Sequence, residues 1–234
     1  MKLSALSLLL FTLAGGGILR AQDPDEEPER GVARMSVIGG DVSVRRGDSG
    51  DYVAAAINAP LVTGDRVLTG AESRAEVQFD HSNMARLSSD AEVRLAELEY
   101  RRYQVQVAQG TVTFRVLRDQ ESEVEISTPN VSVRPVKRGI YRITMHADGT
   151  SEITVRAGEA EVFTPRGSER LRSGKTMLAR GTASDPEYQM VSEVREDQWD
   201  QWNEQRDREL ERSRSYEYLS RDIYGAEDLD GHGR

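Results

Sequence analysis

The feature that most constrains the fold is a period-two alternation of apolar and polar residues within residues 128–174. Tyr141, Ile143 and Met145 fall on one side of an extended strand, and the polar residues between them fall on the other. Asp148-Gly149 follows, a dipeptide that accepts the positive φ angles of a tight hairpin, and a matching alternation comes after it. This stretch therefore predicts half-buried strands joined by a hairpin, with no sign of a catalytic residue set.

Short strand-like runs separated by turn residues repeat this pattern from residue 31 onward. The runs are residues 35–38, 42–45, 75–79, 93–98, 103–107, 111–117, 124–127 and 160–163. Residues 91–102 fit either a helix or a strand, and we favour a strand through Leu95 followed by a polar connection. Together these runs predict a mainly β fold, a β-roll or solenoid-type sandwich of many short strands, followed by a charged C-terminal α-helix.

A weak internal repeat favours the roll or solenoid form. Residues 105–114 and 153–162 each contain two alternating apolar residues, a glycine three positions later and two more alternating apolar residues. Residues 40–44 resemble a third, degenerate copy, although coincidence among β-rich segments is the alternative. A glycine at a shared place predicts a sharp bend where a side chain would obstruct the backbone. The residues expected to shape turns are Gly64, Asp65, Gly110, Gly139, Asp148, Gly149, Gly158 and Gly174.

Two regions of the chain, residues 40–98 and 128–174, contain a series of short motifs. These are residues 40–44, 60–67, 69–70, 73–77 and Leu87, then residues 128–129, Gly139, Tyr141, residues 148–149, Val155, Gly158, Leu171 and Gly174. In order and spacing these motifs resemble the FecR domain, a bacterial periplasmic module. The resemblance implies an all-β domain that exchanges protein contacts in the cell envelope. In the best-known members it relays the state of an outer-membrane transporter to a sigma factor through a membrane helix. This sequence shows no cytoplasmic domain before its apolar segment, so we expect a free-standing exported version.

The N-terminus predicts export. Residues 1–21 combine Lys2, an apolar run and a patch of small residues, which is the layout of a secretory signal peptide cleaved after Ala21. A retained membrane anchor is the alternative, but the apolar run is shorter than the ~20 residues of a spanning helix. Residues 22–30 are rich in acids and prolines and predict a solvated linker. We therefore expect the periplasm or cell surface of a bacterium, with no integral membrane span after cleavage.

Composition narrows the possible ligands. The formal net charge of -9 disfavours binding to nucleic acid or an anionic membrane, because the chain would repel phosphate groups. The chain has no cysteine and three scattered histidines, so it offers neither disulfides nor a ligand set for a transition metal. We expect no cofactor and no catalytic residues, and hence no enzyme.

The composition changes after Pro186, which divides a β domain at residues 31–186 from a charged helix and polar tail at residues 187–234. Within 193–214, one narrow helical stripe contains Trp199, Trp202, Arg206 and Leu210. Of these, Trp199, Trp202 and Leu210 are the candidate protein-contact residues. The stripe predicts either a helix laid against its own β domain or a helix that contacts another protein.

The tail that follows this helix contains Tyr216 and Tyr218, which we add to the candidate protein-contact residues. It resembles the start of an uncharacterised C-terminal region of some exported FecR-domain proteins.

The resulting expectation is a non-enzymatic exported module that mediates protein interaction or signal sensing through an envelope protein partner. A structural envelope or matrix component and a carbohydrate- or peptidoglycan-binding module are the alternatives. The sequence leaves the partner and the oligomeric state open.

Overall fold

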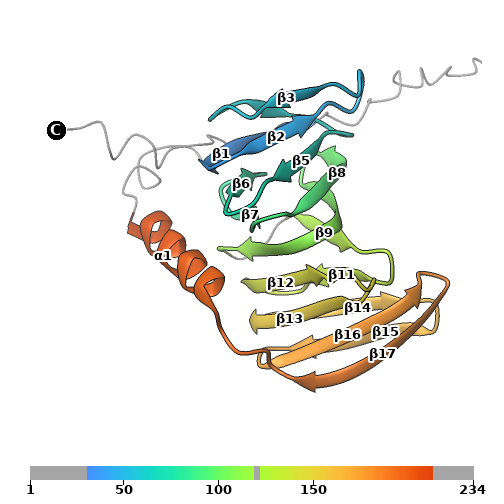
Figure 1. Cartoon of the computed structure of the whole chain (residues 1–234). Helices are drawn as coiled ribbons and strands as arrows, with labels where there is room; N and C mark the ends of the chain where they lie inside the picture. Colours follow the sequence, from blue (N-terminus) through green and yellow to red (C-terminus); the bar gives the residue numbers. More distant parts are fainter. Residues whose placement is uncertain (1–30, 119–121, 213–234) are drawn as a thin grey trace, which may run out of the picture.

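The computed structural model describes residues 31–118 and 122–212, which form seventeen strands and one helix. The pairings arrange the strands in two layers that share one long strand, β9 (Arg102–Val116). The predicted mainly β sandwich of short strands with a C-terminal helix is confirmed, and Figure 1 shows the strands stacked from β3 at one end to β17 at the other.

The first layer pairs through the N-terminal half of β9. Its order is β3 (Tyr52–Ala54), β2 (Val42–Arg45), β5 (Arg66–Thr69), β8 (Glu92–Glu99), β9, β10 (Glu123–Ser127), β11 (Ser132–Pro135), β14 (Glu159–Thr164) and β15 (Gly167–Arg172). The β9–β10 pair is parallel and the other pairs are antiparallel.

The second layer pairs through the C-terminal half of β9, and we call it the helix-bearing sheet. Its order is β4 (Pro60–Leu61), β1 (Ala33–Gly39), β6 (Arg74–Gln78), β7 (Asn83–Leu87), β9, β12 (Gly139–Met145), β13 (Ser151–Ala157), β16 (Lys175–Thr182) and β17 (Asp185–Ser192). The helix α1 (Gln198–Arg212) lies on its outer face, beside the middle of the stack (Figure 1).

The glycines of the weak repeat mark corners between the two layers. Gly40 joins β1 to β2, Gly110 lies inside β9 where its pairing changes layer, and Gly158 joins β13 to β14. Their φ angles are 83, 75 and 89 degrees, a region that side chains disfavour. The shared glycine of the repeat is therefore a backbone corner that folds the chain over the core.

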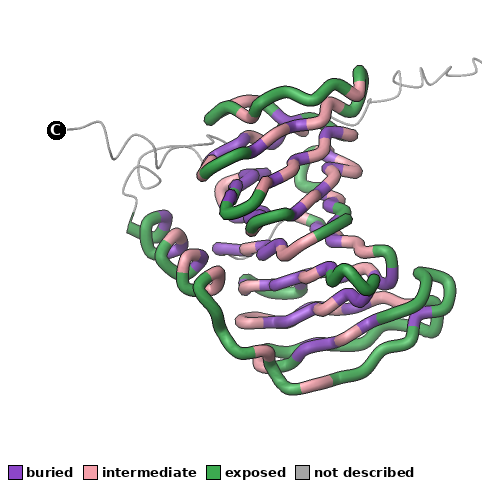
Figure 2. Tube along the Cα trace, viewed as in Figure 1, coloured by how far each residue is buried: buried purple, intermediate pink, exposed green. Residues whose placement is uncertain are grey.

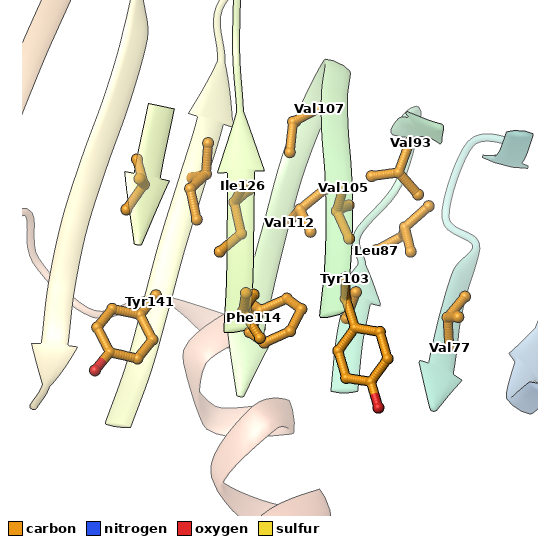
Figure 3. Packing of buried hydrophobic residues seen from close by; sticks show 14 of the residues in the cluster. Val77, Leu87, Val93, Tyr103, Val105, Val107, Val112, Phe114, Ile126 and Tyr141 are labelled. Carbon is orange, nitrogen blue, oxygen red and sulfur yellow. The ribbon is translucent and has the colours of Figure 1, made fainter. Parts of the chain in front are cut away.

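One hydrophobic core lies between the layers and runs from Ala33 to Ala179. Tyr141, Ile143 and Met145 point into it, as their alternation predicts. Figure 3 shows Val77, Phe114 and Ile126 among the side chains that line it, and in Figure 2 buried segments recur along the stack of strands.

Several strands escape the alternation pattern. β8 continues to Glu99 instead of ending in a polar connection after Leu95, because Leu98 returns to the core after a register shift. β17 extends the β region to Ser192, past the boundary expected at residue 186. Most β17 residues are exposed, so the strand carries little apolar pattern. β3 is exposed throughout, so the alternation of apolar and polar residues does not predict this strand either.

Candidate interaction surfaces

α1 begins at Gln198, later than the helical composition suggests, because Asp197 caps it. The Asp197 carboxylate accepts hydrogen bonds from the backbone N–H groups of Trp199 and Asp200, at 2.9 and 3.1 Å. Asp200 in turn accepts from the backbone N–H of Asp197, at 3.2 Å. This reciprocal arrangement is a capping box, which satisfies free donors at the start of the helix.

The two tryptophans of α1 face the molecule's own sheet. Trp199 donates its indole N–H to Thr113 of β9 at 2.9 Å, and its ring stacks on Trp202 with 4.9 Å between centroids. The Arg74 guanidinium lies 5.2 Å from the Trp202 ring centroid, within range of a cation–π contact. Of the two arrangements predicted for the stripe, the structure has the helix laid against its own β domain.

Leu210 is 1% exposed and forms a small apolar cluster with Met84 and Leu117, separate from the main core. It is buried within the molecule and is not a surface available to a partner in this arrangement. Tyr216 and Tyr218 lie outside the described residues, as do the expected signal peptide at 1–21 and linker at 22–30.

Buried charges hold the C-terminal half of α1 to the sheet. Glu76 and Arg86 are 1% and 0% exposed, and their side chains approach to 2.7 Å. Arg206 of α1 reaches Glu76 at 2.9 Å, while Asp207 meets Arg86 at 2.7 Å and Arg115 at 2.5 Å. Burial by itself raises the pKa of Glu76, but Arg86 and Arg206 outweigh it and lower the pKa from 4.5 to about 2. Glu76 is therefore ionised at neutral pH despite its burial.

A second charge cluster holds the start of α1. Asp200 meets Arg142 at 2.6 Å and Arg156 at 2.8 Å, and Arg142 also reaches Asp197 at 2.8 Å. Glu193, just before the helix, pairs with Arg156 at 3.0 Å. Burial raises the pKa of Asp197, but the hydrogen bonds from Arg142 and Asp200 and the positive charge of Arg142 together outweigh it, so the net shift of the pKa is downward. The helix is thus bound mainly through carboxylates and arginines.

The sequence pattern does not distinguish the arginines and the glutamate of the sheet that form these two charge clusters. Arg86, Arg142 and Arg156 occupy alternate strand positions that point away from the core, where a charged residue is ordinary. What connects the sheet residues is the strand register, which places four of them in one row of cross-strand partners: Glu76, Arg86, Thr113 and Arg142. Reading that row requires the strand order, which the sequence does not show.

The predicted turn residues have different roles. The Asp65 side chain is buried after Gly64 and accepts hydrogen bonds from the backbone N–H of Gly47, at 2.9 Å, and from Arg46, at 2.8 Å. Asp148 and Gly149 form the β12–β13 hairpin, in which Asp148 accepts from the Thr150 N–H at 3.0 Å.

Gly174, with a φ angle of 78 degrees, lies in the β15–β16 turn. Gly139 does not form a turn, which corrects the expectation: it is the first residue of β12. Its constraint is space, since a Cβ there would lie 2.2 Å from the Ala157 carbonyl oxygen.

The β3–β4 end of the sandwich exposes a group of large apolar residues. They are Val32 at 47%, Tyr52 at 64%, Val53 at 41%, Ile57 at 51% and Val62 at 46%. Within the described residues, β3 pairs only with β2, so its other edge presents backbone groups that no strand satisfies. This end therefore combines apolar surface with an open strand edge.

The opposite end of the sandwich carries an open groove with basic side chains in its lining. Its volume is about 760 Å³, and it is lined by Arg170, Arg172 and Lys175 together with residues 190–192. Arg170 lies 3.1 Å from Glu159, so part of its charge is already balanced.

Within residues 31–118 and 122–212, no cluster of histidine and carboxylate side chains is arranged to hold a metal ion. The described helix is too short and too polar to cross a membrane.

Comparison with protein families gives a match to the FecR protein family over residues 65–161. This segment, 97 of the 234 residues, is the part of the chain that is similar to the FecR family. The resemblance that the sequence motifs indicated is thereby confirmed, although the match begins after the motif at residues 40–44 and ends before Leu171. No curated protein matches the chain significantly.

Two crystal structures of a protein from Parabacteroides distasonis ATCC 8503, described as a "putative anti-sigma factor", are similar to this chain. The sequence identities are 19% and 18%, and the TM-score is 0.46 in both comparisons. Each comparison covers 55% of this chain and 59% of the other. The matched part therefore spans less than two thirds of the length of those proteins.

Proposed function

We propose that this FecR-domain protein is an exported, non-enzymatic module that senses a signal or joins a complex by binding an envelope protein, in the bacterial periplasm or at the cell surface. Its FecR family match and its all-β scaffold support a regulatory role of this kind. The signal-peptide layout of residues 1–21 supports export.

The observation that carries the proposal is the apolar β3–β4 end of the sandwich. Exposed apolar residues that cluster beside an open strand edge mark protein-interaction sites, because association buries the apolar surface and pairs the free backbone groups. Tyr52 and Val53 lie on that edge strand itself. The partner we propose is a protein that contributes an extended segment to β3.

The test places a photo-crosslinking amino acid at Val53, or at the exposed Gln201 of α1 as control, in the full chain expressed in its own cells. We expect the chain in the exported fraction, shortened by removal of residues 1–21, and crosslinked to an envelope protein from Val53 only. Retention in the cytoplasm would refute export. Absence of a crosslink, or equal crosslinks from both positions, would refute the β3 surface.

A further inference from the structure

The outer face of the helix-bearing sheet is an arginine-rich surface shaped for a helix. Five strands each place one arginine on it: Arg74, Arg86, Arg115, Arg142 and Arg156. Glu76 is a buried acid among them, and the other carboxylates that pair with these arginines come from α1 and from the residues just before it. In a chain whose net charge is -9, this concentration of positive charge stands out.

The spacing of α1 matches the spacing of the strands. Arg206 contacts Glu76 of β6, Asn203 contacts Arg86 of β7, and Trp199 contacts Thr113 of β9. These contacts are three and four residues apart, so about one helical turn of ~5.4 Å covers each strand spacing of ~4.8 Å.

The carboxylates obey the same spacing. Asp200 lies between the arginines of β12 and β13, and Asp207 lies between those of β7 and β9. Seven residues of helix rise about 10.5 Å, close to the two strand spacings that separate these arginine pairs. The face therefore fits a helix with acids seven residues apart.

The contact between α1 and the sheet is largely polar. Leu210 is the one fully buried apolar residue of α1. The rest of the attachment consists of the half-buried Trp199 and Trp202 and of ion pairs whose desolvation offsets much of their attraction. Within the described residues, Arg86 Nη2 and Arg142 Nε donate no hydrogen bond to another protein atom. A helix bound in this way can be displaced without unfolding the core, from which its apolar cluster is separate.

We propose that this face is a receptor for an acidic amphipathic helix of a protein partner, and that α1 occupies it in the absence of that partner. The inference rests on the proposed function in protein interaction and adds a second surface to it. The partner helix carries two carboxylates seven residues apart and an aromatic face, and it replaces α1. Displacement releases Trp199 and Trp202, the residues that the sequence marks for protein contact.

The experiment measures binding of a fluorescein-labelled peptide of residues 193–214 to the full chain by fluorescence anisotropy. The chain variant Asp200→Asn, Asp207→Asn loosens its own helix and frees the arginines, so we expect it to bind the peptide at least tenfold more tightly than wild type. Leu210→Ala loosens the helix without changing any charge, and we expect tighter binding there too. Circular dichroism verifies that each chain keeps its β structure.

The matched control is a peptide that carries the same two Asp→Asn substitutions, which we expect to bind at least tenfold more weakly. Equal binding of the two peptides would overturn the proposal, as would a failure of both chain variants to gain affinity. Because purified chain and synthetic peptide are used, the result is independent of export and of the β3 surface. Failure here is therefore distinguishable from failure of the proposed function.

Discussion

Single residues at the layer corners fix the path of the chain. At Gly158 a Cβ would lie 2.6 Å from both the Arg138 carbonyl oxygen and the Tyr141 hydroxyl, and the backbone has positive φ. Gly149 in the β12–β13 hairpin has a similar φ of 81 degrees, but an added Cβ would meet no atom within 4 Å. A side chain at Gly149 would therefore meet backbone strain alone, whereas a side chain at Gly158 would meet both backbone strain and a steric clash.

We expect Gly158→Ala to lower the free energy of unfolding by about 3 kcal/mol, because it adds a clash to a strained φ. Gly149→Ala is the matched control and should cost about 1 kcal/mol, from φ alone. Urea unfolding followed by circular dichroism measures both. Equal losses in the two variants would show that the close approach at Gly158 is unimportant.

The buried Glu76 predicts a specific dependence of stability on pH. Its folded-state pKa of about 2 lies below its usual 4.5, so its contribution is complete above about pH 4.5 and is lost as the pH falls toward 2. A difference of this size corresponds to about 3 kcal/mol. Stability should therefore fall on acidification in a window where an uncharged side chain would not respond.

Glu76→Gln removes that titrating group. We expect the variant to be less stable than wild type by about 3 kcal/mol at pH 7, because Arg86 loses a buried counter-charge. Between pH 5 and pH 3 its unfolding free energy should fall less than that of wild type, as measured by urea unfolding at each pH. A parallel decline of the two proteins would contradict the prediction.

At the scale of elements, α1 is an attached unit, distinct from the sandwich. Its capping box defines where it starts, and its inward face follows the row of cross-strand partners on the helix-bearing sheet. Its one fully buried apolar residue is Leu210, which packs with Met84 and Leu117 outside the main core. Loss of that packing should loosen the helix without affecting the strands.

We expect Leu210→Ala to speed hydrogen exchange of the α1 amides by roughly 10- to 100-fold, equivalent to about 2 kcal/mol of lost packing. The amides of β9 and β12 should keep their exchange rates. Gln201→Ala, at an exposed position of the same helix, is the control and should change little. Exchange measured by mass spectrometry would contradict the prediction if β9 and α1 lost protection together.

At the scale of the whole molecule, β9 joins the two layers and lies in the middle of both strand orders. Its neighbours are β8 and β10 in one layer and β7 and β12 in the other. The ends of the stack are short or exposed: β4 has two residues and β3 is exposed throughout. Stability should therefore decline from the centre toward both ends, as in other stacked architectures.

We expect hydrogen-exchange protection to be greatest in β9, β7 and β12 and to fall toward β3 and β17. The difference between centre and ends should reach several kcal/mol, because the central strands are paired on both sides and buried. Residue-resolved exchange at neutral pH measures it. Uniform protection along the stack, or the slowest exchange in β3, would contradict this description.

The sequence predicts those parts of the molecule whose signals are local. Alternation identifies a strand such as 141–145, and Asp148-Gly149 identifies a hairpin, because the pattern and the structure involve the same few residues. Strands without buried faces, such as β3 and β17, lack that signal and were missed. The helix stripe was visible, but its binding surface was not.

By itself, the sequence determined the β class of the fold, the glycine corners and the FecR resemblance, because each depends on residues that lie close together in the sequence. Only the tertiary structure decided what the tryptophan stripe covers and which charges are buried. Arg206 and Glu76 are 130 positions apart, and they meet because the strand order and the outward side of β6 bring them together. Such a pair depends on the folded arrangement of the strands, so no local pattern could have shown it.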